Sequence, residues 1–191
     1  RDDVESRGLG DVYKRQPCIC DVYEKGICTS STSKVFSSAG TRVGWIVTRD
    51  LSIKDAMMNM RSYHSICEGP INELIAAIIL ENKEVFYKRN TAIVKAAQDV
   101  LKEWLKGQPH FKPAVESKSS TAFLYYDFDI PAADFAQELY DKKSTLVCHG
   151  ACFEQEHCFR IGFGFGDLAY FKAGLDQIGE FVKELETEGR I

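Results

Sequence analysis

The stretch Ser31-Thr32-Ser33-Lys34, followed closely by Gly40-Thr41-Arg42-Val43-Gly44-Trp45, decides how this chain is interpreted. It places one lysine amine, three hydroxyl groups and one guanidinium within a short arc flanked by glycine. Hydroxyl groups can donate to phosphate oxygens, and a guanidinium can bind them through two parallel hydrogen bonds. A lysine amine is the group that condenses with carbonyl compounds. The pattern predicts a loop that binds a phosphate and keeps an amine free for carbonyl chemistry, which suits pyridoxal phosphate.

A Ser-rich surface loop carrying a solvated lysine is the alternative interpretation. The run Val43-Gly44-Trp45-Ile46-Val47 argues against it, because a short apolar segment of this kind is typical of a strand. Such a strand would fix Arg42 to a buried element. Positive charge beside a lysine also favours the neutral amine that carbonyl chemistry requires, so we expect Arg42 to assist Lys34.

These residues resemble the lysine motif of the class I and II aminotransferases, which are pyridoxal-phosphate enzymes of fold type I. The family pattern is Ser-x-Ser-Lys, an aromatic residue two positions later, and Gly-x-Arg-x-Gly. The chain fills every position of that pattern, with Ser31, Ser33, Lys34, Phe36, Gly40, Arg42 and Gly44. The resemblance implies that Lys34 is catalytic and carries the cofactor covalently, and that Ser31, Ser33 and Arg42 help to bind it.

A second motif occupies residues 157–164, with the sequence His-Cys-Phe-Arg-Ile-Gly-Phe-Gly. It is similar to the family segment whose arginine binds the α-carboxylate of the substrate, and it implies that role for Arg160. A planar guanidinium on a strand can hold a carboxylate through two parallel hydrogen bonds. A structural ion pair between Arg160 and Glu154 or Glu156 is the alternative.

The resemblance implies an α/β fold that corresponds to the C-terminal part of a fold type I enzyme. Residues 17–85 would form the end of the large αβα domain, and residues 86–191 the connector helix and the small α+β domain. Apolar periodicity predicts a helix after Gly69-Pro70, with Ile71, Leu74, Ile75, Ile78 and Ile79 on one apolar face. It also predicts helices over 83–106, 131–141 and 167–185, and strands over 121–128, 145–148 and 158–163.

Residues 1–16 are expected to be a non-native tail. They lack apolar periodicity, and they end in Asp11-Val12-Tyr13-Lys14-Arg15-Gln16, which resembles the translated end of a transposon-derived sequencing adapter. We therefore expect the family's phosphate loop, ring-stacking aromatic residue and pyridine-nitrogen aspartate to lie upstream. Asp21-Val22-Tyr23 has one residue too few for the family's Asp-x-x-Tyr element, and we do not assign it that role.

Composition excludes several other classes of protein. A net charge of −4 without long charged runs argues against nucleic-acid binding, and no apolar run reaches the length of a membrane span. Seven cysteines without a CxxC pair indicate reduced thiols, so we expect a cytoplasmic protein. Cys148, His149, Cys152, His157 and Cys158 crowd together, but their spacing matches no common zinc module and we expect no metal.

The resemblance implies transamination between an amino acid and a 2-keto acid, by a homodimer when full length. Pyridoxal-phosphate-dependent C–S lyases and cyclases of the capreomycidine synthase type use the same lysine and arginine, so they remain alternatives. Segments 21–27 and 127–131 resemble the aminotransferase subgroup that is likened to those cyclases, and aromatic or aspartate aminotransferases are the other subgroups considered. A truncated chain without catalytic activity is an alternative of another class.

Overall fold

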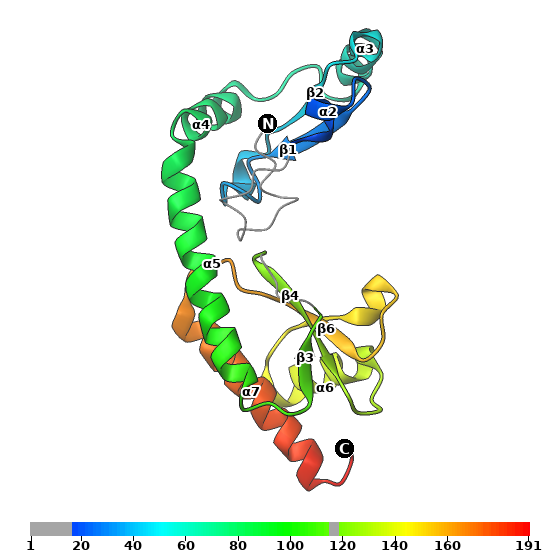
Figure 1. Cartoon of the computed structure of the whole chain (residues 1–191), viewed down its shortest axis with the longest axis vertical. Coiled ribbons are helices and arrows are strands. Elements are labelled where there is room, and N and C mark those ends of the chain that lie inside the picture. The colour runs from blue at the N-terminus through cyan, green and yellow to red at the C-terminus, as the bar shows by residue number, and fades with distance from the viewer. Residues whose placement is uncertain (1–16, 115–118) are drawn as a thin grey trace. The chain divides into compact units, whose positions relative to one another are not determined.

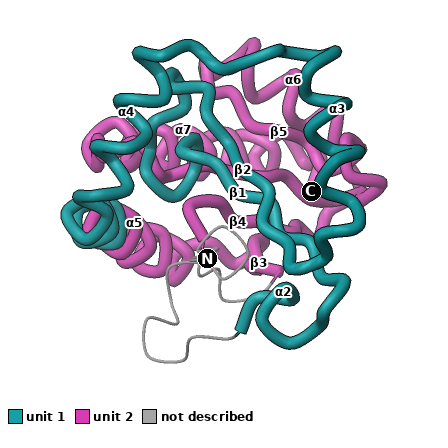
Figure 2. Tube along the Cα trace, turned by 90° about the horizontal axis from the view of Figure 1, so that it is seen from above, with its two compact units in different colours: residues 1–91 teal, residues 92–191 magenta. Residues whose placement is uncertain are grey.

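A computed structural model of the chain describes residues 17–114 and 119–191 (Figure 1). The chain divides into two compact units, Arg1–Thr91 and Ala92–Ile191, which are coloured separately in Figure 2. The boundary between them falls inside helix α5 (Lys83–Leu105). The domain boundary predicted between residues 85 and 86 stays a prediction, and the expected non-native tail over residues 1–16 lies outside the described residues.

The first unit is built around a two-stranded antiparallel sheet. Strand β1 (Ile27–Ser31) pairs with β2 (Gly44–Thr48), so that Ile27 lies opposite Thr48 and Ser31 opposite Gly44. The strand predicted from the apolar run after Arg42 is therefore present. Around this sheet lie the short helix α2 (Ile19–Val22), helices α3 (Lys54–His64) and α4 (Pro70–Glu81), and the first turns of α5.

Helix α4 begins where the sequence predicts, with Pro70 at its first position. Its apolar face is only partly buried among the described residues. Ile79 is 4% exposed and packs against Val35 and Phe36, whereas Ile71 and Leu74 are 74% and 62% exposed. Within the described residues, only the side of α4 that carries Ile79 packs against the segment that follows Lys34. No helix in the described part of the chain is long and apolar enough to cross a membrane.

The second unit contains a four-stranded antiparallel sheet in the order β3-β4-β6-β5. Its strands are β3 (Phe111–Pro113), β4 (Thr121–Tyr126), β5 (Cys148–His149) and β6 (Cys158–Gly162). Helices α6 (Ala132–Lys143) and α7 (Leu168–Thr187) complete the unit with the C-terminal part of α5. The mixture of helices and sheet confirms the predicted α/β class, and both sheets contain antiparallel pairs only.

Strand β5 is shorter and later than the strand predicted over 145–148. Helix α6 ends at Ser144, which adopts a left-handed conformation with φ of 52°, and a 3-10 helix begins at Gly150. These two features leave only Cys148 and His149 to pair with β6. The predicted bounds are wrong because the apolar pattern of a segment does not show which of its residues will have a neighbouring strand to pair with.

The core of the second unit lies between the sheet and helices α6 and α7. Phe135 of α6 stacks on Phe159 of β6, with ring centroids 5.4 Å apart, and both side chains are fully buried. One apolar stripe of α7 is buried in this core, whereas Leu168 at the start of the helix is 38% exposed. Its buried members are Phe171, Leu175, Ile178, Val182 and Leu185. This packing holds β6 rigidly, and β6 carries Arg160.

Candidate active site

The loop that carries Lys34 is closed at its base by Thr32. The backbone N–H of Thr32 donates to the carbonyl of Val43 at 3.0 Å, and the N–H of Ser38 donates to the carbonyl of Thr32 at 3.1 Å. The Thr32 hydroxyl lies 3.2 Å from the Val43 oxygen and 3.3 Å from the Ser38 oxygen. Because Thr32 is completely buried, these bonds are shielded from water, and they join the two ends of the motif.

The two residues after Lys34 anchor the loop to the helical part of the unit. Val35 and Phe36 are buried, and the Phe36 ring stacks on Tyr87 of α5 with centroids 5.4 Å apart. The side-chain amide of Asn90, also on α5, donates to the carbonyl of Val35 at 2.7 Å. The aromatic position of the motif therefore acts as a structural anchor, and the backbone beside Lys34 is fixed from a second direction.

Lys34 itself is exposed, with its carbonyl accepting a hydrogen bond from the N–H of Ser37 at 3.1 Å. Ser31 and Ser33 are half-buried, and the N–H of Ser33 donates to Ser31 Oγ at 3.3 Å. The structure thus presents the amine on a firmly held loop. The described residues leave this amine open to solvent.

Arg42 follows the 3-10 helix Ala39–Thr41 and adopts a left-handed conformation with φ of 54°. Its side chain is exposed, donates one hydrogen bond to the carbonyl of Ala39 at 3.1 Å, and has no carboxylate partner among the described residues. Since Ser31 pairs with Gly44, Ser31 and Arg42 are brought to the same end of the loop. A guanidinium without a carboxylate partner among the described residues, on a loop that also carries serine hydroxyls, fits a phosphate group.

Arg160 lies on β6 of the second unit, opposite Phe123 of β4 and Cys148 of β5. Its guanidinium is 4.9 Å from the centre of the Phe153 ring, a cation–π contact, and the side chain is half-buried. It lines a groove of about 840 Å³ within this unit. No ion pair joins Arg160 to a described residue, and Glu156 instead accepts from the N–H of Ala132. The alternative of a structural ion pair is therefore wrong for the described part of the chain.

The cluster of cysteine and histidine residues near β5 does not converge on one point. Cys152 contacts His149 at 3.5 Å, but Cys158 is buried in the core of the unit, where desolvation raises the pKa of its thiol. Within the described ranges, the ligand atoms that gather closely enough to hold one metal ion belong to Cys18, Cys20 and Cys28.

Sequence reasoning missed this cysteine cluster of Cys18, Cys20 and Cys28. The sequence contains no CxxC pair, whereas the structure joins a CxC pair at helix α2 to a third cysteine on β1. The backbone N–H of Cys20 is directed at Cys28 and lowers the pKa of the Cys28 thiol, while the hydrogen bond to Cys28 raises the pKa of the Cys20 thiol. The signal available in sequence was the short spacing between a CxC pair and a strand cysteine across a turn that contains Gly26.

Comparison with known proteins defines the class to which this fold and loop belong. The sequence model of the family described as "Aminotransferase class I and II" matches residues 8–178. The chain belongs to the class I and II aminotransferase family. A curated relative, "Probable aminotransferase TAT2" of Arabidopsis thaliana, is 26% identical over 149 residues, which are 70% of this chain and 35% of that protein.

Solved structures give the same fold. A pyridoxal-phosphate-dependent aminotransferase from Streptococcus suis is 28% identical, with a TM-score of 0.83 over 88% of this chain and 44% of that chain. The pyridoxal-phosphate-dependent cyclase OrfR is 23% identical, with a TM-score of 0.75 over 83% of this chain and 43% of that chain. The predicted fold type I architecture is confirmed. The chain spans less than half the length of each of these relatives.

Proposed function

We propose that this chain supplies the lysine loop and the carboxylate-binding strand of a pyridoxal-phosphate-dependent transaminase, which exchanges an amino group between an amino acid and a 2-keto acid. The observation that carries this proposal is the lysine loop, in which Thr32 closes the base and Asn90 fixes the backbone beside Lys34. Membership of the class I and II aminotransferase family supports the reaction type.

The residues of the first unit suit the phosphate and the aldehyde of the cofactor. Arg42 would bind the phosphate through its guanidinium, with Ser31 and Ser33 donating from their hydroxyl groups. Lys34 would hold the cofactor covalently when no substrate is bound. Pyridoxal phosphate, when bound, withdraws electrons from the α-carbon of an amino acid and so makes its proton removable. Lys34 would then carry that proton as general base and general acid.

Arg160 in the second unit would bind the α-carboxylate of the substrate. Its contact with Phe153 holds the side chain from one side and leaves its hydrogen-bond donors available, because the ring accepts only the charge of the guanidinium. A carboxylate could then take two parallel hydrogen bonds, which fix both its position and its orientation. Because Lys34 and Arg42 lie in the first unit and Arg160 lies in the second, separate substitutions test the two assignments.

We further infer that this chain does not catalyse transamination by itself. Lys34 is exposed among the described residues, and the chain covers 44% of the Streptococcus suis aminotransferase. A general base in water gains none of the electrostatic advantage of a desolvated site. In the longer protein we expect a cytoplasmic homodimer, as in the sequence prediction. The cyclase and C–S lyase chemistries remain the second candidate, favoured by the fold shared with OrfR.

The test uses the reading frame extended to the length of the solved relatives. Incubation with an amino acid and 2-oxoglutarate should produce glutamate and the matching keto acid. Release of ammonia or sulfide without any need for a keto acid would support a lyase instead. Arg160→Leu should raise KM for amino acids far more than for simple amines that lack a carboxylate, and equal losses for both would remove the carboxylate role.

A further inference from the structure

The cysteine cluster defined above lies outside the lysine loop and has no role in the proposed transamination. The three sulfur atoms of Cys18, Cys20 and Cys28 all lie within 4.8 Å of one another. Cys18 and Cys20 are 3% and 4% exposed, and Cys28 is half-buried. Three thiols that converge in a largely buried position are an unusual arrangement for reduced core cysteines, which behave individually as small apolar side chains.

The fold builds this arrangement from a tight turn. The N–H of Tyr23 donates to the carbonyl of Ile19 at 2.8 Å, and the N–H of Gly26 donates to the carbonyl of Tyr23 at 2.9 Å. A Cβ atom on Gly26 would collide with the backbone of Ile19 and Cys20, so glycine is required for this close approach. The turn places helix α2 against the start of β1 and brings the CxC pair to Cys28.

The backbone around Cys18 is fixed by neighbouring charges. The carboxylate of Asp21 accepts a hydrogen bond from the N–H of Cys18 at 3.1 Å, and it lies 3.7 Å from the guanidinium of Arg49, which follows β2. A residue that orients a ligand without touching the ion is typical of built metal sites. Asp21 therefore acts as a positioning residue for Cys18.

The space beside the sulfur atoms is small and mostly apolar. A cavity of about 10 Å³ is lined by the three cysteines together with Ser30, Trp45, Val47 and the intervening Thr29. Cys28 and Ser30 lie on one face of β1, opposite Val47 and Trp45 of β2. The buried Ser30 hydroxyl has no hydrogen-bond partner among the described residues, so it is available to donate to a sulfur atom that carries negative charge.

We propose that Cys18, Cys20 and Cys28 bind one thiophilic d10 metal ion, Cu(I) or Zn(II), through three thiolates. Sulfur atoms bound to one ion at the usual metal–sulfur distance lie roughly 3.8–4.0 Å apart, so the observed cluster needs only a small contraction. Soft thiolate ligands select these ions over Mg²⁺ or Ca²⁺. Binding replaces the three thiol protons, which are released to the solvent, and no oxidant or reductant is consumed.

The two ions differ in what they require of the cavity. Zn(II) prefers four ligands, so a water molecule or the Ser30 hydroxyl would have to complete its tetrahedron. Cu(I) is satisfied by soft ligands alone, and a cavity with room for about one atom favours it. Separate titrations with the two ions distinguish them, and the stoichiometry is expected to be one ion per chain in either case.

The test is anaerobic titration of the fully reduced chain with Cu(I) or Zn(II) alone, followed by competition with a chelator. We expect saturation at one equivalent, a sulfur-to-metal charge-transfer band in the ultraviolet with Cu(I), and no binding of Mg²⁺. Cys28→Ser should weaken binding by at least about 100-fold, and Asp21→Asn by about 10-fold. Cys67→Ser is the matched control in the same unit, because Cys67 is exposed and outside the cluster.

A second measurement does not depend on whether the variants fold. In the wild-type chain, one equivalent of bound ion should slow alkylation of Cys18, Cys20 and Cys28, as mapped by mass spectrometry, and leave exposed Cys67 as reactive as before. The proposal is overturned if the reduced chain shows no stoichiometric binding, if Cys67→Ser weakens binding as much as Cys28→Ser, or if the ion protects Cys67 instead of the cluster.

Discussion

Asn90 on α5 is bonded directly to the backbone of Val35, the residue that follows Lys34. The distance between Asn90 Nδ2 and the Val35 oxygen is 2.7 Å, and Asn90 is 6% exposed. The Asn90 Oδ1 atom is buried without a hydrogen-bond partner among the described residues, so the bond from Nδ2 to the lysine loop is the polar contact that holds this side chain. It connects the long helix to the segment on which the proposed chemistry depends.

Replacing this amide should therefore destabilise the first unit. Asn90→Ala leaves the buried carbonyl of Val35 without its partner, and we expect a loss of about 1–3 kcal/mol in the free energy of unfolding. Chemical denaturation measures this change. Asn82→Ala is the matched control, since the Asn82 amide bonds to the Ile78 carbonyl at an exposed helix end. Equal losses in both variants would show that Asn90 has no special role.

Gly150 should not tolerate a side chain. A Cβ atom at this position would collide with the sulfur of the buried Cys158 and with the Gln155 carbonyl. We expect Gly150→Ala to lower the free energy of unfolding by about 1–3 kcal/mol. Gly174→Ala on α7 meets nothing within 4 Å and should raise stability by up to about 1 kcal/mol. A Gly150→Ala protein as stable as wild type would contradict the packing described for β5 and β6.

The second unit should lose stability as pH rises through the neutral range. His110 lies between Asp127 at 2.7 Å and Glu186 at 3.0 Å, and the hydrogen bond to Asp127 is the main cause that raises the pKa of the imidazole in the folded state. The protonated form stabilises the fold fully below the ordinary histidine pKa, near 6.5, and this contribution disappears as pH rises through the higher folded-state value.

Unfolding measurements from pH 5.5 to 9 would detect this effect, and His110→Gln should flatten the profile over roughly that range. His64→Gln is the control, because His64 lies at the exposed end of α3. An unchanged pH profile in His110→Gln would show that the imidazole carries no charge-dependent contact. Asp127, whose pKa is lowered by the same hydrogen bond, should contribute stability that is lost only in acid.

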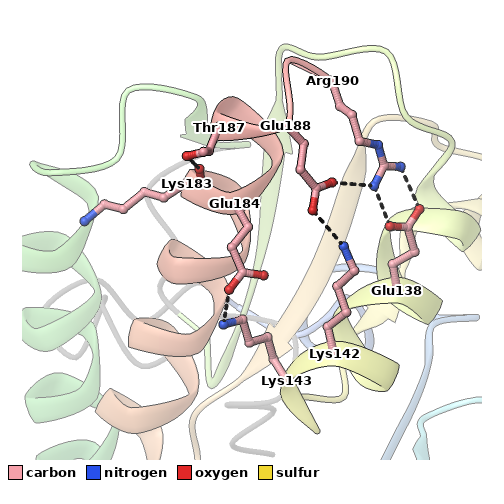
Figure 3. A network of polar contacts seen from close by, with 8 residues as sticks. All are labelled: Glu138, Lys142, Lys143, Lys183, Glu184, Thr187, Glu188 and Arg190. Carbon is pink, nitrogen blue, oxygen red and sulfur yellow. Dashed lines mark hydrogen bonds and ion pairs between the residues drawn. The ribbon is translucent and has the colours of Figure 1, made fainter.

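The C-terminus should be held by a salt-sensitive pair. The guanidinium of Arg190 reaches both carboxylate oxygens of Glu138 on α6, at 2.7 and 2.8 Å, and Figure 3 shows this pair beside Lys142 and Glu188. Glu138→Gln should lower the melting temperature slightly in low salt, and the difference should shrink in high salt because the pair is partly exposed. A difference that grows with salt would contradict an electrostatic origin.

The parts of the site that depend on neighbouring residues along the chain could be predicted from the sequence. The motif around Lys34 and Arg42 predicted a loop before a strand, and β2 begins within one residue of that prediction. It did not reveal that Thr32 and Asn90 fix the loop, because their partners lie 11 and 55 residues away. A sequence motif depends on residue types at short spacing, whereas a hydrogen bond between distant segments depends on how those segments pack.

Cysteine chemistry shows the same limit. The cysteine and histidine residues around His149 lie close together in sequence. Their ligand atoms do not gather at one point, because Cys158 is buried in the core of the second unit. Cys28, in contrast, is brought to Cys18 and Cys20 by a turn whose geometry depends on Gly26. In this chain, the tight turn between α2 and β1 brings cysteines together, whereas close spacing in sequence around His149 does not.

The central claim is that Lys34 is the attachment point for pyridoxal phosphate, and covalent trapping tests it directly. The chain is incubated with pyridoxal phosphate, reduced with borohydride, digested and mapped by mass spectrometry. We predict that Lys34 is modified well ahead of the exposed Lys25 in the same unit. Excess inorganic phosphate or Arg42→Ala should reduce this preference, and Lys25→Ala should leave the rate of Lys34 modification unchanged. Modification of Lys34 no faster than Lys25 would contradict the claim.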